Sequence, residues 1–160
     1  MNPVTWIVAA DRSRARFFEM APPDGAWTEH EALEHPRARL HDRDLNTDEP
    51  GVGRDSGGRG RHPMTAAVSP KQEEAREFAR RLCDRLERAA DRGGFQRLVL
   101  VAPPAFLGVV RRRLGPNTRR LLATTLAKEL SQQPVHVIRA ALGLPAQASR
   151  PFVGALAGTA

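Results

Sequence analysis

The sequence predicts a single α/β domain, built on a mixed five-stranded sheet with helices on its faces. Three observations lead to this prediction. The first 34 residues contain three β-rich segments separated by turn signals, which is typical of an antiparallel meander. A strongly signalled helix comes later in the chain. After it lies an apolar segment without polar alternation, as expected of a strand covered on both faces.

The meander is predicted from residues 4–34. Residues 4–10 are apolar and β-rich, which indicates a largely buried first strand, and residues 15–20 form a second strand after a short turn. The Pro-Pro-Asp-Gly sequence at 22–25 is a strong turn signal. Residues 27–34 alternate irregularly and are polar, so we expect a third strand near the sheet edge, with a short helix as the alternative.

The helix after the long polar region has both of its ends marked. Ser69 is a suitable N-cap, Pro70 fits the first helical position, and Gln72 completes a capping box. The helix is predicted to run to about Arg92, where Gly93-Gly94 stops it. Its apolar face, at spacings of three and four, consists of Ala75, Phe78, Ala79, Leu82, Leu86 and Ala89.

The last part of the chain completes the sheet. Residues 97–102 form the predicted buried strand, and residues 106–114 form a short helix. Asn117 can cap a further helix, and residues 134–139 form a final short strand. The order β-β-β-α-β-α-α-β is that of a ribonuclease H-like fold. The further helix is expected to carry on one side Leu121, Leu122, Leu126 and Leu130.

We expect one domain over residues 1–139. Residues 35–68 show no sustained period and are predicted to be a long mobile loop, while residues 140–160, rich in alanine, glycine and proline, are predicted to be a disordered tail. No apolar run approaches the ~20 residues of a membrane span, and the N-terminus lacks the features of a secretory signal. The sequence therefore predicts a cytoplasmic protein without a membrane segment and without a cofactor.

Metal-dependent or thiol chemistry is not favoured. Asp11 closes the first strand and could serve a nuclease, but the central strand ends in Ala-Pro-Pro without an acid, so Asp11 is predicted to be a turn residue pairing with Arg12 or Arg14. The acidic segment 42–48 lacks the glycine and glutamate of a calcium loop. Cys83 is predicted to be a buried hydrophobe. Ligand spacing is also missing among His35, His41 and His62, so no metal site is predicted.

Positive charge is concentrated toward the C-terminus. The formal net charge is +7, and residues 101–160 hold eight basic residues against the single acid Glu129. A genome rich in G and C would favour arginine throughout, whereas a basic face toward nucleic acid would use arginine to grip phosphate. Two further interpretations stay open for the basic residues beside the Gly115-Pro116 break: a solvated helix end, or a phosphate-gripping corner. These residues are Arg111, Arg112, Arg113, Arg119 and Arg120.

The segment 51–62 is rich in glycine and arginine and cannot build a core. It is either slack or a mobile arm whose backbone N–H groups and guanidinium groups meet an anionic surface. In the second case the expected nucleic-acid contacts are Arg54, Arg59, Arg61 and His62.

Several linked motifs are spread over roughly residues 4–139. They are Trp6-Ile-Val-Ala-Ala-Asp-Arg-Ser-Arg-Ala-Arg-Phe-Phe18, His35-Pro-Arg-Ala-Arg, Asp42-Arg-Asp-Leu, Ser56-Gly-Gly-Arg-Gly-Arg-His62, Glu77-Phe-Ala79 and Leu98-Val-Leu-Val-Ala-Pro-Pro-Ala-Phe-Leu-Gly108. Together they resemble the bacterial host-attachment proteins, described as "protein required for attachment to host cells". That family is similar in turn to the middle domain of archaeal and eukaryotic class-one peptide release factors, a ribonuclease H-like sheet that carries a Gly-Gly-Gln loop.

The resemblance implies that Gly57 and Gly58 occupy the place of the two glycines, and that Arg59 stands where release factors carry glutamine. It implies a ribosome- or RNA-associated factor with ribosomal RNA or tRNA as partner, and hydrolysis of peptidyl-tRNA esters in ribosome rescue as its reaction. A glycine pair would let a backbone N–H approach the reacting ester. The alternative is a non-enzymatic binding or regulatory protein that affects attachment indirectly. The stop-codon-reading domain of a release factor has no counterpart here, so codon-directed termination is not expected.

Overall fold

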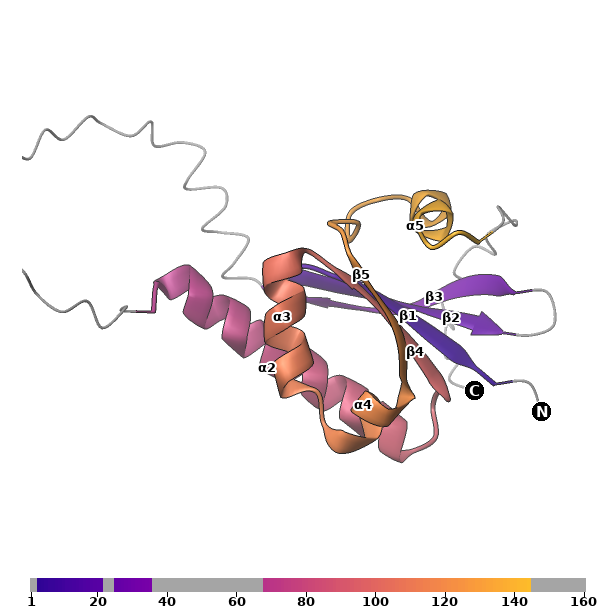
Figure 1. Ribbon diagram of the computed structural model, residues 1–160, viewed down its shortest axis with the longest axis horizontal. Helices are drawn as coiled ribbons and strands as arrows, with labels where there is room; N and C mark the ends of the chain where they lie inside the picture. Colours follow the sequence, from indigo (N-terminus) through magenta and orange to yellow (C-terminus); the bar gives the residue numbers. More distant parts are fainter. Residues whose placement is uncertain (1–2, 22–24, 36–67, 145–160) are drawn as a thin grey trace, which may run out of the picture.

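In a computed structural model, the domain is a sheet with helices on both faces (Figure 1). The structure describes residues 3–21, 25–35 and 68–144. The predicted order of the first seven elements is confirmed, and so is the α/β class. In chain order the elements are β1 (Thr5–Ala10), β2 (Arg14–Ala21), β3 (Ala26–Glu34), α2 (Pro70–Asp91), β4 (Arg97–Ala102), α3 (Pro104–Arg113), α4 (Pro116–Leu121), β5 (Leu122–Ala127) and α5 (Val135–Ala141).

The sheet is mixed, with the strand order β3-β2-β1-β4-β5. Strands β1, β2 and β3 pair antiparallel as a meander, with a register shift between Phe17 and Phe18. Strand β4 then lies parallel to β1, and β5 lies parallel to β4. This arrangement confirms the ribonuclease H-like fold that the element order predicts. It also brings the carboxyl ends of β1, β4 and β5 to one edge of the sheet.

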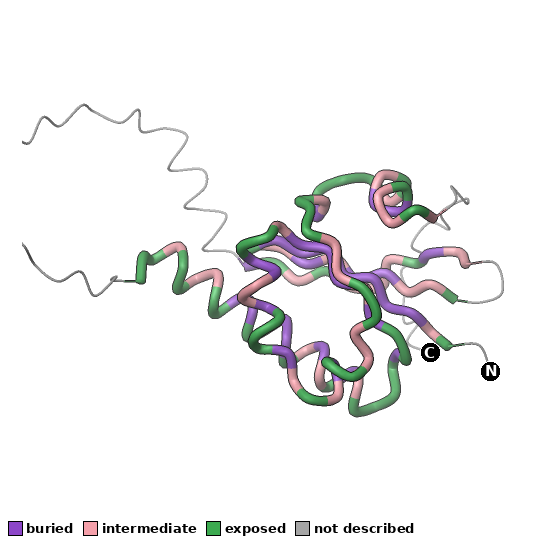
Figure 2. Tube along the Cα trace, in the orientation of Figure 1, coloured by how far each residue is buried: buried purple, intermediate pink, exposed green. Residues whose placement is uncertain are grey.

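Helices α2, α3 and α4 cover one face of the sheet, and α5 lies over the other (Figure 1). Successive strand residues point to opposite faces, so β1 is buried throughout and contributes to two cores (Figure 2). Trp6 and Val8 pack in the cluster beneath α2 and α3. Ile7 and Ala9 pack in the cluster beneath α5, together with Phe18, Trp27, Val101 and Ile138.

Helix α2 begins and ends as its sequence predicts. The Ser69 hydroxyl accepts the Gln72 backbone N–H, and the Gln72 side chain accepts the Ser69 N–H, which completes the capping box. At the other end, Gly93 adopts a φ of +68°, a conformation that side-chain-bearing residues rarely take. Its apolar face is buried through Phe78, Ala79, Leu82, Cys83, Leu86 and Ala89.

The predicted helix capped by Asn117 is wrong at both ends: α4 begins at Pro116 with Gly115 as its N-cap, and it ends at Leu121. Residues 122–127 are instead the edge strand β5, where two threonines favour the extended backbone. The register against β4 shifts between Leu98, opposite Leu122, and Val99, opposite Thr124. This irregularity lets Leu122 pack with the core beneath α2 while Leu126 packs with the core beneath α5. Leucine spacing alone therefore did not specify a helix face.

The predicted final strand at 134–139 is also wrong, because these residues begin helix α5. Local preference misled here, since alternating β-branched residues favour a strand. In the fold, Val135, Ile138 and Leu142 lie at helical spacing and cover the second face of the sheet. Leu144 packs on the same cluster, and residues 145–160 lie outside the described part of the chain.

Candidate functional site

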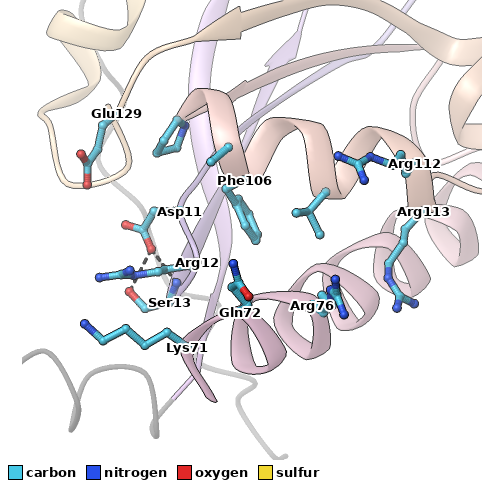
Figure 3. A pocket seen from close by; sticks show the side chains of 14 residues that line it. Asp11, Arg12, Ser13, Lys71, Gln72, Arg76, Phe106, Arg112, Arg113 and Glu129 are labelled. Carbon is cyan, nitrogen blue, oxygen red and sulfur yellow. Dashed lines mark hydrogen bonds between the residues drawn. The ribbon is translucent and has the colours of Figure 1, made fainter. Parts of the chain in front are cut away.

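A groove of about 670 Å³ opens between the first turns of α2 and helix α3, beside the turn that follows β1 (Figure 3). Ala75 of α2 and Phe106 and Val109 of α3 give it an apolar floor. The groove lies outside the carboxyl ends of β1 and β4, the place where open α/β sheets usually bind ligands. Both its position and its size, within the ~300–1,000 Å³ of typical ligand sites, make it the candidate functional site.

Positive charge dominates the rim of this groove. Among the described residues that line it, five are basic and two are acidic, Asp11 and Glu129. The basic side chains come from three separate elements, which only the tertiary structure brings together. They are Arg12 from the β1–β2 turn, Lys71 and Arg76 from α2, and Arg112 and Arg113 from the last turn of α3.

Three of these cations have no partner in the described structure. Lys71, Arg112 and Arg113 make no hydrogen bond or ion pair with another described residue, although Lys71 is half-buried. Arg76 is exposed and lies 4.0 Å from Glu73, a surface pair of little energetic weight. The planar guanidinium group of an unpaired arginine suits an anion with two oxygen acceptors, such as phosphate or carboxylate. The groove is therefore suited to an anionic ligand.

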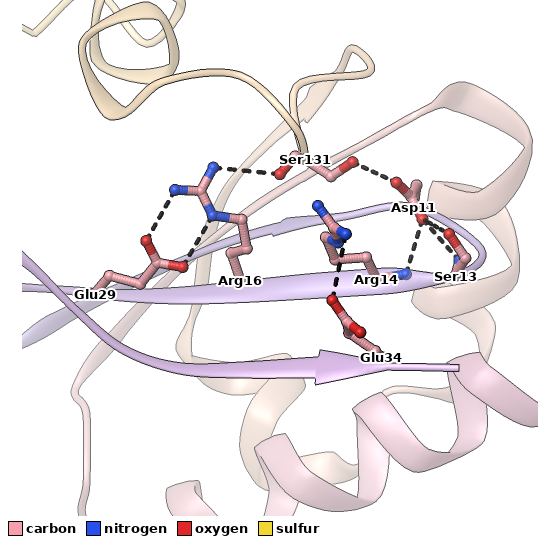
Figure 4. Close-up of polar contacts among 7 residues, drawn as sticks. All are labelled: Asp11, Ser13, Arg14, Arg16, Glu29, Glu34 and Ser131. Carbon is pink, nitrogen blue, oxygen red and sulfur yellow. Dashed lines mark hydrogen bonds and ion pairs between the residues drawn. The ribbon is translucent and has the colours of Figure 1, made fainter. Parts of the chain in front are cut away.

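Both carboxylate oxygens of Asp11 accept hydrogen bonds that hold the turn after β1 and the segment after β5 (Figure 4). Its Oδ1 accepts hydrogen bonds from the Ser13 N–H at 2.7 Å, the Ser13 hydroxyl at 2.8 Å and the Arg14 N–H at 2.8 Å. Its Oδ2 accepts the Ser131 hydroxyl. The prediction of a turn residue is confirmed, but the contact with Arg14 uses the backbone, because the Arg14 guanidinium pairs with Glu34 at 3.3 Å.

The segment after β5 is fixed to the sheet by Arg16. This guanidinium group holds Glu29 through two hydrogen bonds of 2.9 and 2.8 Å (Figure 4). It also donates to the Gln133 carbonyl at 2.7 Å. A weaker bond reaches the Ser131 carbonyl at 3.3 Å. Together with the hydrogen bond between Ser131 and Asp11, these contacts place the exposed Glu129 at the rim of the groove. The groove thus has one acidic side chain facing its basic wall.

The predicted basic cluster near Gly115 divides into two groups. Arg112 and Arg113 line the groove. Arg119 instead donates to the carbonyls of Arg111 and Leu114, each at 3.3 Å, at the C-terminal end of α3. There it neutralises the helix end, as the alternative interpretation predicts. Arg120 donates to the side-chain oxygen of Asn117.

Glu87 holds the corner between α3 and α4, a role that the sequence analysis missed. Its carboxylate accepts the Asn117 N–H at 3.0 Å, the Thr118 N–H at 2.9 Å and the Thr118 hydroxyl at 2.6 Å. Burial raises the pKa of Glu87, but these hydrogen bonds outweigh burial and lower the pKa overall. A Cβ on Gly115 would lie too close to the Glu87 carboxyl group, so the Glu87 side chain would have to move to admit it.

Two other residues considered for chemistry lie in the core. The pKa of the buried Cys83 thiol is raised to about 12, chiefly by burial, so the prediction of an inert small hydrophobe is confirmed. His35 is buried against Phe78, and its Nε2 lies 3.8 Å from Glu77. Within the described ranges, no three His, Cys, Asp or Glu residues are grouped so that they could hold a metal ion.

The other predicted site residues lie outside the described part of the chain. The sequence alone pointed to two of the groove's cations, Arg112 and Arg113, and missed the other three. Lys71 could have been noticed as one of only two lysines in an arginine-rich chain. The predicted residues outside the described ranges are Arg54, Gly57, Gly58, Arg59, Arg61 and His62.

Among solved structures, the chain is similar in fold to an archaeal translation termination factor, aRF1, at 13% identity and a TM-score of 0.44, over 88% of this chain and 35% of that one. A second archaeal protein matches at 14% identity and a TM-score of 0.42, over 79% of this chain and 30% of that one. The chain thus spans about a third of the length of these structures. At these values the similarity supports no argument about activity.

No curated protein matches the sequence. In the described residues, none of the helices has the length and apolar character needed to cross a membrane. A family profile, described as "Protein required for attachment to host cells", matches residues 6–142, which is most of the chain. The chain therefore belongs to this host-attachment family.

Proposed function

We propose that the protein is an RNA-associated module that holds the phosphate backbone of ribosomal RNA or tRNA in the groove between α2 and α3. The observation that supports this most directly is that Lys71, Arg112 and Arg113 line the same groove and that none of them has a partner among the described residues. A surplus of unpaired cations attracts a polyanion, and arginine suits phosphate in particular.

The finer part of the proposal is a role on the ribosome. The resemblance to release-factor middle domains assigns Gly57 and Gly58 to a loop that approaches a peptidyl-tRNA ester, with Arg59 at the position of the glutamine. In this role the protein would rescue stalled ribosomes by ester hydrolysis. The groove would then anchor RNA backbone while the loop approaches the reacting bond.

Family membership favours a second candidate, a non-enzymatic binding or regulatory protein whose effect on host attachment is indirect. The groove supports this candidate because Asp11, one of its two acidic residues, already accepts four hydrogen bonds. Its carboxylate is therefore poorly suited to act as a general base. The first candidate requires RNA binding by this surface. The second requires neither RNA binding nor the breaking of a bond.

Sedimentation with ribosomes at low and high salt tests RNA association. We expect the protein to pellet with ribosomes at low salt and to be released at high salt, because phosphate contacts depend on counterion release. Arg112→Glu with Arg113→Glu should abolish pelleting. Arg81→Glu with Arg88→Glu reverses the same charge on exposed positions of α2 outside the groove and should pellet normally. A protein that stays in the supernatant at every salt concentration would contradict the proposal.

Release of peptide from a stalled peptidyl-tRNA complex separates the two candidates. Ester hydrolysis predicts release by the unmodified protein and its loss in Gly58→Val, because a side chain would block the close approach. Arg59→Glu with Arg61→Glu should weaken ribosome binding as well. If the unmodified protein pellets with ribosomes but releases no peptide, the non-enzymatic candidate is correct.

A further inference from the structure

We infer that the groove between α2 and α3 binds a single RNA strand, without base specificity, in preference to an RNA duplex. This inference rests on the proposed RNA association and specifies the form of RNA that the groove takes. It is argued from the length of the groove, its width and the nature of its floor.

The length of the groove favours a polymer over a mononucleotide. Helix α3 has 10 residues, about 15 Å at the rise of an α-helix. Arg12 lies at the end of the groove where α3 begins, whereas Arg112 and Arg113 lie in the last turn of α3 (Figure 3). One phosphate group cannot contact cations at both ends of this helix. A strand that follows the groove presents a phosphate at each nucleotide and can contact both.

The width of the groove excludes a duplex from its floor. Helices α2 and α3 pack against each other through Phe78 and Phe106, whose rings stack at 6.1 Å, so the space between their outer surfaces is a narrow seam. The axes of two packed helices lie about 8–10 Å apart. An A-form duplex is a stiff convex cylinder that proteins read over many base pairs. A flexible single strand can enter the seam and reach both walls.

The floor offers little for reading bases. Single-strand sites often stack bases on exposed aromatic rings. Phe106 is the aromatic residue among the described residues that line the groove, and it is only 5% exposed. The accessible floor is aliphatic, from Ala75 and Val109. Affinity should therefore follow the number of phosphate contacts and change little with base sequence.

Fluorescence anisotropy with a labelled oligouridylate of roughly 12 nucleotides, and with an RNA duplex of the same length, tests this inference. We expect the single strand to bind at least about tenfold more tightly than the duplex at equal salt. An oligocytidylate should bind within about threefold of the oligouridylate, because no base is read.

The salt dependence identifies the contacts. Each phosphate contact to a single strand contributes about 0.7 to the slope of log Kobs against log salt. Arg112→Ala with Arg113→Ala should therefore lower the slope by about 1.4, whereas Arg81→Ala with Arg88→Ala should leave it unchanged. Circular dichroism would check that each variant is folded. Lys71→Ala, expected to lower the slope by about 0.7, is a milder test should the arginine pair prove necessary for folding.

The failures of the two proposals are distinguishable. Equal or tighter binding of the duplex would overturn the single-strand inference and leave RNA association in place. Single-strand binding with an unchanged slope in the folded groove variants would show that the strand binds elsewhere, which also overturns the inference. Absence of binding to either RNA, together with absence of ribosome pelleting, would overturn both.

Discussion

The Ser131 hydroxyl donates a hydrogen bond to the carboxylate of Asp11, a residue 120 positions earlier in the chain. Both side chains are buried, and the contact ties the segment after β5 to the carboxyl end of β1. A carboxylate in this position of an α/β sheet often performs chemistry. Here the Asp11–Ser131 hydrogen bond acts as a clasp, which joins the two chain segments at one end of the groove.

Replacing Ser131 tests the clasp. Ser131→Ala leaves Asp11 Oδ2 buried with one hydrogen-bond donor fewer, which should lower the free energy of unfolding by about 1–3 kcal/mol. Urea denaturation would measure the loss. Gln132→Ala, at the exposed neighbouring position, should change it by less than about 0.5 kcal/mol. Equal stability of the Ser131 variant and the parent would show that the clasp contributes nothing.

A double-mutant cycle tests the fit between Gly115 and Glu87. Gly115→Ala places a Cβ 2.3 Å from the Glu87 carboxyl carbon, so the cap must move, and we expect a loss of about 1–3 kcal/mol. Glu87→Ala removes the cap at a cost of about 1 kcal/mol. Because the clash disappears with the carboxylate, the double variant should lose less than the sum of the single losses. Additive losses would show that the contact with Glu87 is not the cause of the Gly115→Ala loss, because the Gly115 backbone, with a φ of −65°, suits any residue.

The same cap should make stability depend on pH in the acid range. The pKa of Glu87 is lowered because, against the effect of burial, the hydrogen bonds from Thr118 and Asn117 favour the charged form. The folded state therefore binds a proton less readily than the unfolded state. Its stabilising contribution is present above the ordinary pKa of 4.5 and is lost as pH falls through the lower folded pKa. Denaturation across this range should show a smaller acid-induced loss in Glu87→Gln than in the parent.

His30 should produce a second pH dependence at higher pH. Its ring packs 4.6 Å from Trp6, and its Nε2 is buried without a hydrogen-bond partner in the described structure. Burial lowers its pKa below 6.5, assisted by Arg85 of α2, and this outweighs the opposing effect of Glu19 and Glu31. The contribution of neutral His30 is full above 6.5 and is lost as pH falls from there through the folded pKa.

Proton NMR titration measures this effect directly. We expect the His30 ring to titrate below the ordinary histidine value in the folded protein. The fall of stability below pH 6.5 should be shallower in His30→Gln than in the parent. A His30 ring that titrates at or above 6.5 would contradict this account, because the neighbouring carboxylates would then dominate over burial.

Elements with local signals were predictable from the sequence. The capping box of Ser69 and Gln72 and the stop at Gly93 fix α2 through contacts within a few residues. Strand β5 and helix α5 were not predictable in this way. Their residues take the structure that covers an edge or a face of the sheet, so tertiary packing overrode the local pattern of leucines and β-branched residues.

The residues of the groove were likewise only partly predictable from the sequence. Arg112 and Arg113 are adjacent in the sequence and stand out there as a basic cluster. Lys71 lies about 40 positions earlier in an ordinary amphipathic helix, and only the packing of α2 on α3 places it along the same groove as the two arginines. A composition rich in arginine does not indicate which basic residues lie along one groove. The arrangement of the helices on the sheet determines this.

Cys83 offers a measurement of how often the core beneath α2 opens. Its thiol is buried, contacts the Val110 carbonyl at 3.6 Å, and has a pKa raised to about 12, chiefly by burial. The reactive thiolate is therefore scarce in the folded protein at neutral pH.

We expect an aromatic disulfide reagent to label Cys83 at least about a hundredfold more slowly in the folded protein than in urea, at a rate set by opening of the α2–α3 contact. Val110→Ala should speed labelling by creating a cavity beside the sulfur, whereas Val68→Ala, at an exposed position, should leave the rate unchanged. Rapid stoichiometric labelling of the folded parent would mean that the sulfur is accessible and that α2 does not cover this core in solution.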